Sequence, residues 1–280
     1  MKILITGSSG QLGTSLSRSL QKYKIIECNS RFAEKDIFFD EIKNIEFDLL
    51  INCVALHDLS LCEKNKVLSD IMNTNIPYKL SEICKNKKKK FIHFSTDYVF
   101  DGLINRKYHE SDITKPLNYY GLSKLNGEKL ITKNKNSLIF RVSSLFGTRR
   151  NISSKNFIEK IINLSKKVEK IDMVKDQIMN PTSTNLISDI FNKNLESILE
   201  LNGVFHLCHK KETTWFEFTK FIFEKLKIKT KLDPINYEDL KSDINRPLNT
   251  TLSTKKIENS LNININSWEE NLIDYLNEFK

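Results

Sequence analysis

The stretch that decides the fold is KILITGSSGQLG, residues 2–13. An apolar run that predicts a strand is followed directly by Gly7, Gly10 and Gly13, and a helical pattern begins at Gln11. In this context Gly7 permits a tight turn, Gly10 lets the backbone approach a pyrophosphate, and Gly13 lets the helix pack closely on the strand. The N-terminus of the helix then faces the negative charge. The stretch therefore predicts a dinucleotide-binding loop.

Short apolar runs alternate with helical-period segments through the first 150 residues, which is typical of consecutive βαβ units. The fold class predicted is α/β, a doubly wound parallel Rossmann-like sheet with ligands beyond the carboxyl ends of its strands. The expected strands are Lys2–Thr6, Lys24–Asn29, Asp48–Cys53, Phe91–Ser95 and Leu138–Val142, and the expected helices are Gln11–Gln21, Val67–Asn86 and Tyr119–Lys133.

The alternation is less regular after Gly147. We expect a dinucleotide-binding core over residues 1–149, to which 170–207 add strands and a helix, and a smaller C-terminal substrate-binding lobe made mainly from 150–280. No Pro/Gly-rich linker separates the halves, so a cleft between them is the natural substrate site. The expected elements are helices at 155–167, 184–199 and 215–226, strands at 170–174 and 204–207, and a final amphipathic helix after Ser267.

Composition argues against several other classes of protein. With 39% hydrophobic and 28% charged residues, 280 residues can bury a large core, so a disordered chain is not expected. Five cysteines without a CxxC pair predict neither disulfides nor a metal site. Without a signal peptide or an apolar run near the roughly 20 residues that span a bilayer, we expect a cytoplasmic protein that binds no membrane. The formal charge of +9 includes the run Lys87–Lys90, but no interleaved aromatic residues accompany it, so no nucleic-acid partner is expected.

The end of the second strand predicts which dinucleotide binds. An NAD-specific site carries an acidic residue there, against the ribose 2′-hydroxyl. This chain has Ser30 and Arg31 instead, and a guanidinium can grip a 2′-phosphate. We therefore expect NADPH as the cofactor, with NADH as the weaker alternative.

A second motif, Tyr120-Gly-Leu-Ser-Lys124, has the spacing YxxxK on a predicted helix. This spacing places the phenol and the ammonium on one face, one turn apart, where the cation can lower the pKa of the tyrosine. The phenol can then give a proton to a carbonyl oxygen while hydride arrives at the carbon. Upstream, the predicted strand FIHFS ends at Ser95 and is followed by Thr96, whose hydroxyl is expected to orient the carbonyl toward Tyr120.

These motifs carry a family resemblance over almost the whole chain. The strings STDYVFDG at 95–102, PLNYYGLSK at 116–124, GEK at 127–129, Asp176-Gln177 and Pro181-Thr182 resemble those of dTDP-4-dehydrorhamnose reductases, which are extended short-chain dehydrogenases. Farther on, GVFHL at 203–207, TTW at 213–215, and Arg246-Pro247 followed by LST at 252–254 resemble the same family.

The resemblance implies reduction of a nucleotide-activated 4-keto-6-deoxy sugar, with hydride delivered to C4 and no metal. Asn73 matches a family asparagine beside the site. The implied catalytic residues are Thr96, Tyr120 and Lys124. The implied cofactor-binding residues are Gly7, Ser9, Gly10, Gln11, Leu12, Ser30, Arg31, Asp36, Ile37, Cys53, Val54, Ala55, Tyr120 and Lys124. The implied substrate-binding residues are Thr96, Asp97, Asn156, Phe157, Gln177 and Arg246.

One departure bears on the substrate. Where rhamnose-pathway enzymes often have a tryptophan, this chain has Leu145 in RVSSLF, 141–146, so the sugar and its nucleotide stay open. Two other functions stay open as well. One is a non-catalytic regulatory subunit like the beta subunit of methionine adenosyltransferase, and the other is a sugar-nucleotide epimerase or dehydratase that keeps a tightly bound NAD. A homodimer is also left open.

Overall fold

In the computed structural model, residues 1–280 are described except 29–35, 149, 151–155 and 280. The described residues form a central sheet of six parallel strands in the order β10-β5-β4-β3-β1-β2. This confirms the doubly wound α/β fold. The strands are β1 (Lys2–Thr6), β2 (Lys24–Cys28), β3 (Leu49–Asn52), β4 (Lys90–Thr96), β5 (Ser137–Val142) and β10 (Gly203–His206).

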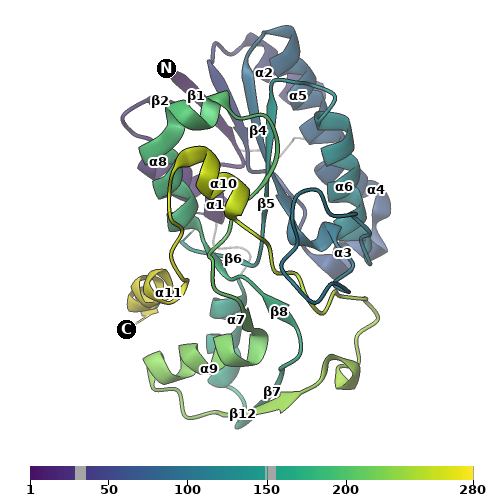
Figure 1. Cartoon of the computed structure of the whole chain (residues 1–280), viewed down its shortest axis with the longest axis vertical. Coiled ribbons are helices and arrows are strands. Elements are labelled where there is room, and N and C mark those ends of the chain that lie inside the picture. The colour runs from purple at the N-terminus through teal and green to yellow at the C-terminus, as the bar shows by residue number, and fades with distance from the viewer. Residues whose placement is uncertain (29–35, 149, 151–155, 280) are drawn as a thin grey trace.

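Helices cover both faces of this sheet (Figure 1). On one face, α1 (Gln11–Ser19), α8 (Thr184–Glu200) and α10 (Lys255–Leu261) enclose a core with the side chains of β1, β4 and β5. On the other face, α2 (Asp36–Asn44), α5 (Ile76–Asn86) and α6 (Tyr119–Ile131) enclose a second core. Strands that are apolar on both faces, such as β3 and β4, are therefore the centre of the sheet.

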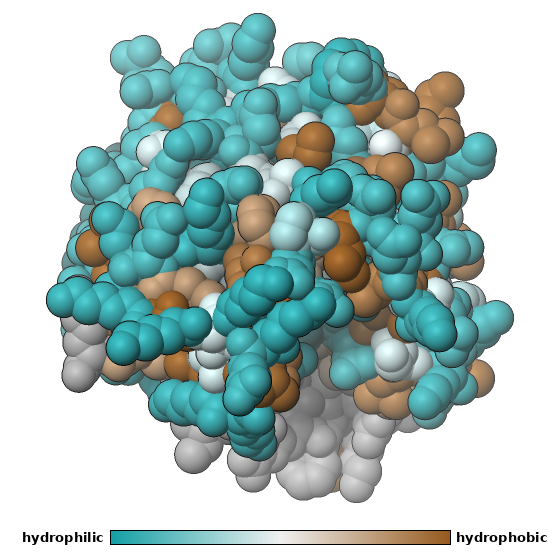
Figure 2. Space-filling view, turned by 90° about the horizontal axis from the view of Figure 1, so that it is seen from below, coloured by the Kyte–Doolittle hydropathy of each residue, from teal (hydrophilic) through white to brown (hydrophobic). Residues whose placement is uncertain are grey.

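A smaller lobe lies beyond the carboxyl ends of the strands, at the bottom of Figure 1. It has its own apolar core, which includes Phe146, Phe218 and Trp268. Seen from below, the molecule is mostly hydrophilic, with hydrophobic residues in several separate patches (Figure 2). The elements are β6 (Leu145–Phe146), α7 (Phe157–Ser165), β7 (Lys170–Val174), β8 (Ile178–Met179), β9 (Thr182–Ser183), β11 (Thr213–Thr214), α9 (Trp215–Leu226), β12 (Lys231–Ile235) and α11 (Glu269–Leu276).

One strand lies elsewhere than expected. The segment 170–174 is a strand, as predicted, but it pairs in parallel with β12 in the small lobe and does not extend the main sheet. Its burial alternates at first, because Ile171 belongs to the lobe core while Lys170 and Asp172 are exposed. A strand of the buried main sheet would be apolar on both faces. From residues 170–207, only β10 joins the main sheet.

The helix predicted over Val67–Asn86 is interrupted. The structure has α3 (Leu59–Lys64), α4 (Lys66–Asp70), a π-helical turn (Ile71–Asn75) and then α5. Such turns occur frequently at functional sites because the extra residue redirects a side chain. Short 3-10 turns lie at Asp97–Val99, Tyr237–Asp239 and Asn277–Phe279. No helix in the described ranges has both the length and the apolar character to cross a membrane.

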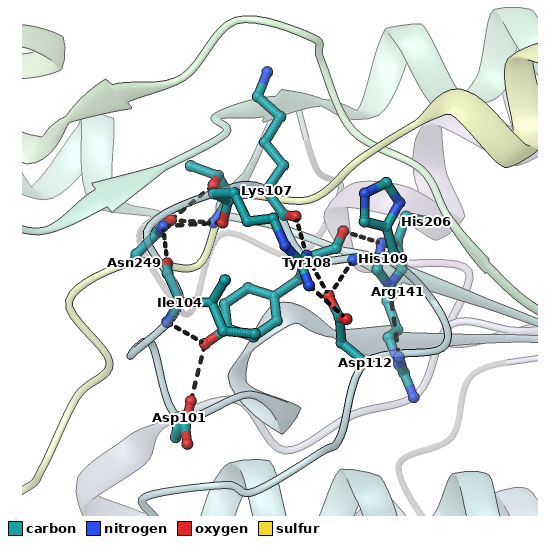
Figure 3. A network of polar contacts seen from close by, with 11 residues as sticks. Asp101, Ile104, Lys107, Tyr108, His109, Asp112, Arg141, His206 and Asn249 are labelled. Atoms are coloured by element: carbon teal, nitrogen blue, oxygen red, sulfur yellow. Dashed lines mark hydrogen bonds and ion pairs between the residues drawn. The ribbon is translucent and has the colours of Figure 1, made fainter.

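A crossing segment, residues 245–253, joins the lobe to the loop that follows β4. The Tyr108 N–H donates to Thr251 O (2.8 Å), and the Ser253 N–H donates to Tyr108 O (2.8 Å). Figure 3 shows the same junction, where the Asn249 amide donates to Ile104 O at 2.7 Å. A Cβ on Gly102 (φ +78°) would lie 2.6 Å from Cβ of Pro247, so the two backbones meet with no space for a side chain.

Candidate active site

The glycine loop has the geometry of a dinucleotide site. Gly7 has φ +71°, and a Cβ there would lie 2.9 Å from the carbonyl carbon of Cys53. A Cβ on Gly13 would lie 2.3 Å from Gly7 O, so the protein itself requires glycine at both positions. Gly10 differs, because its Cβ would meet the protein only at 3.4 Å. Gly10 is also the N-cap of α1, where no side chain caps the helix, so its bare backbone suits a close-lying anionic ligand.

The other predicted cofactor residues are only partly described. Ser9 and Gln11 are half-buried at this loop, while Leu12 packs into the core. After β3, Cys53 is half-buried, Val54 is buried and Ala55 is exposed. Ile37 is exposed on α2. Ser30 and Arg31 lie outside the described residues, as does the side chain of Asp36, so the NADPH preference stays a prediction.

Two of the three predicted catalytic residues touch directly. Thr96 ends β4, Tyr120 is the second residue of α6, and a hydrogen bond joins their side chains. The helix starts at this place because the Asn118 side chain caps it, accepting from the Gly121 N–H at 2.9 Å. A Cβ on Gly121 would lie 2.2 Å from Tyr98 O, so only glycine lets α6 lie this close to the turn after β4.

The Tyr120 phenol is protonated at neutral pH. Burial is the main cause that raises its pKa above the ordinary value; the hydrogen bond with Thr96 opposes this, and the Asp97 charge adds to it. Its ring also meets the Tyr98 ring edge-on, with centroids 5.9 Å apart. A phenol that keeps its proton can serve as an acid.

The third residue, Lys124, lies one turn along α6 with an exposed fraction of 1%. Its Nζ donates to Phe94 O at 2.6 Å and lies 3.1 Å from Nε2 of His93. Burial lowers the lysine pKa to about 8, and the charge of Glu128 opposes this shift. The prediction that Lys124 lowers the pKa of Tyr120 does not hold in this structure, because burial raises that pKa and Lys124 does not offset it.

Asp97, expected to contact substrate, is instead 2% exposed and bound by protein hydroxyls. Its carboxylate accepts from Ser143 (2.7 Å) and Thr96 (3.0 Å), and Thr250 of the crossing segment is a third hydrogen-bond partner. Burial raises the pKa of Asp97, and these three hydrogen bonds oppose the shift. Asp97 therefore orients Thr96 and joins the ends of β4 and β5 to the crossing segment.

Asn73, on the π-helical turn, fixes the segment after β3. Its Oδ1 accepts from the Leu56 N–H, and its Nδ2 donates to Leu56 O, each at 2.9 Å. The same Nδ2 donates to Ser123 Oγ on α6 at 3.1 Å. Asn73 thus links the predicted cofactor-lining residues after β3 to the helix that carries Tyr120.

Of the predicted substrate residues, Arg246 lies beside the catalytic residues. Its charge acts on the buried Tyr98, and its buried Nε has no hydrogen-bond partner among the described residues. The Gln177 Nε2 donates to Pro247 O at 3.4 Å, so Gln177 adjoins the crossing segment. A buried guanidinium nitrogen without a partner suits an anionic ligand group.

Asn156 and Phe157 have roles within the lobe. Asn156 caps α7, accepting from the Glu159 N–H (2.9 Å) and donating to the Tyr275 hydroxyl (2.7 Å). Phe157 packs on Trp215, with ring centroids 4.4 Å apart. These contacts account for both residues without a ligand, so the geometry adds nothing to their prediction as substrate residues.

The sequence analysis missed two buried polar residues, Asn52 at the end of β3 and His93 in the middle of β4. Both are fully buried, and the His93 ring lies between Asn52 and Lys124. The available signal was a polar side chain within an otherwise apolar strand. In the described ranges, no group of three or more His, Cys, Asp or Glu side chains is placed to hold a metal ion.

Comparison with known proteins shows the family of this chain. Residues 1–280 match the family described as "RmlD substrate binding domain". The chain belongs to this family. A dTDP-4-dehydrorhamnose reductase of Aggregatibacter actinomycetemcomitans is 30% identical over 97% of each chain. The structure of such a reductase, an RfbD ortholog from Clostridium acetobutylicum, matches with a TM-score of 0.92 at 28% identity, covering 100% of this chain and 99% of that one. That of a Bacillus anthracis reductase in complex with NADP gives 0.90 at 27% identity, covering 99% of each chain.

Within this family member, Leu145 is half-buried in β6 and pairs with Thr182 of β9. Leu145 also packs against the core formed by α1 and α8. An aliphatic side chain here offers less surface for stacking on a sugar than an indole would.

Proposed function

We propose that this protein reduces a nucleotide-activated 4-keto-6-deoxy sugar with NADPH, delivering hydride to C4 while Tyr120 gives the proton to the carbonyl oxygen. The observation that carries the proposal is the contact between Thr96 and a protonated Tyr120, at the carboxyl end of β4 and one helical turn from Lys124. Ligands of doubly wound sheets bind at this edge.

NADPH supplies the hydride. The residues of the chain would bind it and position the proton. The N-terminus of α1, opened by Gly10, would hold the pyrophosphate, and Ser30 and Arg31 are the residues that the sequence predicts for the 2′-phosphate. Lys124 binds the nicotinamide ribose and, as an ammonium, stabilises the phenolate that remains after proton transfer. Thr96, oriented by Asp97, directs the carbonyl oxygen toward the phenol.

On the substrate side, Arg246 binds the nucleotide diphosphate. Its buried Nε, which has no hydrogen-bond partner among the described residues, lies in the crossing segment beside the loop after β4. The charge of Arg246 acts on Tyr98, whose ring packs against that of Tyr120. Gln177 binds nearby, with Asn156 and Phe157 as further predicted contacts from the lobe. The activities named for the relatives support this class of substrate. The cytoplasmic location and the domain boundary at residue 149 stay predictions from the sequence.

A substrate panel tests the proposal. NADPH oxidation is followed with 4-keto-6-deoxy sugars on thymidine, guanosine, uridine and cytidine diphosphates. We expect oxidation to depend on the sugar nucleotide and to be faster than with NADH. Binding of NADPH without oxidation by any sugar would point to a regulatory subunit. Tightly bound NAD that turns over without net oxidation would point to an epimerase or dehydratase.

A further inference from the structure

The hydrogen bonds around His93 determine which of its ring nitrogens carries the proton. Asn52 Oδ1 accepts from the Val54 N–H (3.1 Å) and the Thr6 hydroxyl (2.8 Å). A backbone N–H can only donate, so the orientation of the Asn52 amide is fixed. The other end of the amide, the Nδ2 amino group, therefore faces Nδ1 of His93 at 3.0 Å.

An amino group can only donate, so Nδ1 of His93 must accept and carries no proton. The ring is then neutral, with its one N–H on Nε2. Burial holds the pKa of His93 well below the usual value, which agrees with a neutral ring. A ring turned over would put carbon atoms against both polar neighbours.

The Nε2–H points at Lys124 Nζ, 3.1 Å away. An ammonium has three donors and no acceptor, whereas a neutral amine has a lone pair that can accept. At the same time Nζ donates to Phe94 O at 2.6 Å, which an amine can also do. Only the amine form of Lys124 satisfies every hydrogen bond of this arrangement.

The other titratable groups near Lys124 do not supply a counter-charge in contact with it. The Glu128 carboxylate binds Arg141 at 2.7 Å and acts on Lys124 only through its field. Burial raises the pKa of the Cys53 thiol, which therefore stays neutral. Among the described residues, Lys124 forms no ion pair.

We propose that His93, oriented by Asn52, is a positioning residue that favours the neutral amine form of Lys124 in the ligand-free protein at mildly alkaline pH, and that Lys124 then takes up one proton from solvent when the dinucleotide binds. The inference rests on the proposed function for the identity of the ligand. The ribose hydroxyls of the dinucleotide provide acceptors, and its phosphates provide negative charge, both of which favour an ammonium turned away from His93. Binding of cofactor thereby converts Lys124 to its charged form.

The test reads proton positions by NMR in the ligand-free protein. Long-range 1H–15N spectra of histidine, assigned with a His93→Gln variant, should show His93 neutral with its proton on Nε2 at mildly alkaline pH, above the lysine pKa of about 8. A proton on Nδ1, or an imidazolium, overturns the proposal. This measurement needs only the wild-type chain in its folded form.

Asn52→Asp should reverse the direction of the hydrogen bonds on both sides of His93, because a carboxylate accepts where the amino group donated. The His93 proton should move to Nδ1, Nε2 should accept from a Lys124 ammonium, and the lysine pKa should rise by one unit or more, about tenfold in its acid dissociation constant. Thr6→Val is the matched control, because Val54 still fixes Asn52; the lysine pKa should stay unchanged. A variant that folds but keeps the wild-type tautomer and lysine pKa contradicts the proposal.

Calorimetry of NADP+ binding in buffers of different ionisation enthalpy measures the proton uptake. Well above the lysine pKa, we expect uptake approaching about one proton per site in the wild type and none in Lys124→Met. Binding without uptake overturns the proposal. If NADP+ does not bind at all, the proposed function and the proton uptake both fail. The NMR spectra then test only whether His93 carries its proton on Nε2 and favours the amine form of Lys124. If the His93 tautomer and the proton uptake are as proposed but no 4-keto sugar is reduced, only the proposed function is contradicted.

Discussion

Two buried cations in this protein have opposite surroundings. Arg141 on β5 and Lys124 on α6 are 4% and 1% exposed. Arg141 faces a carboxylate, with its guanidinium donating to both oxygens of Glu128, the shortest contact being 2.7 Å. Lys124 faces a neutral imidazole and a backbone carbonyl. Because a buried charge is stable only when it is paired, Arg141 stays charged, whereas Lys124 can lose its proton.

The difference indicates that Arg141 has a structural role and Lys124 a functional one. The Arg141–Glu128 pair ties β5 to α6, and the guanidinium also lies 5.1 Å from the centre of the Phe100 ring. Lys124 lies on the same helix as Glu128 but is free to change protonation state within the range where an enzyme works. The following predictions test this separation.

Glu128→Gln should have the largest effect, a loss of about 3–5 kcal/mol in the free energy of unfolding, because it leaves the Arg141 charge buried and unpaired. Urea denaturation measures this loss. Lys124→Met removes a buried amine that has no counter-ion among the described residues, and it should cost clearly less. If the lysine variant is destabilised as much as the glutamate variant, the two sites do not differ as described.

Tyr120→Phe should lower turnover by about 100-fold or more while leaving NADPH affinity unchanged, because only the proton donor is lost. Tyr119→Phe is the matched control, since the hydroxyl of Tyr119 faces outward to Asp70, to which it donates at 2.7 Å. Steady-state kinetics and cofactor titration measure both variants. Near-normal turnover in Tyr120→Phe would remove the proposed acid.

Arg246→Gln should raise KM for the nucleotide sugar by about tenfold, the expected loss of one charge-assisted hydrogen bond, and leave KM for NADPH unchanged. Lys231→Gln, an exposed cation on β12 in the same lobe, is the control and should change neither constant. An equal effect of both variants would indicate a general loss of positive field in place of a specific contact.

The smallest of these effects at neutral pH is expected from the ionisation of Lys124, which is measured through the pH dependence of catalysis. Because burial lowers the pKa of Lys124 to about 8 in the ligand-free enzyme and catalysis needs the ammonium, kcat/KM for NADPH should decline above that pH, approaching tenfold per pH unit. Lys90 is the matched control: burial lowers its pKa to about 8 as well, yet it binds Leu201 O and Asn202 far along the chain. The Lys90→Met variant should keep the decline in kcat/KM at alkaline pH. If the decline disappears in this variant, it belongs to Lys90 and its assignment to Lys124 is wrong.

The features predicted from the sequence are local. The strand–glycine–helix order and the YxxxK spacing have fixed periodicities, and the structure places Gly7, Thr96 and Tyr120 on the elements expected. The contacts that were missed join residues distant in the chain. His93 to Lys124, Glu128 to Arg141, and β7 to β12 depend on which elements pack together, and hydrophobic periodicity does not encode that pairing.

The central claim is that hydride passes from reduced nicotinamide to the sugar C4 beside Tyr120. The most direct measurement uses NADPH deuterated at the nicotinamide C4 with dTDP-4-keto-6-deoxy sugar, followed by mass spectrometry and NMR of the product. We expect deuterium at C4 of the sugar with the wild-type protein and about 100-fold less labelled product with Tyr120→Phe. Oxidation of NADPH without deuterium at C4, or no oxidation with any 4-keto sugar nucleotide, would contradict the account.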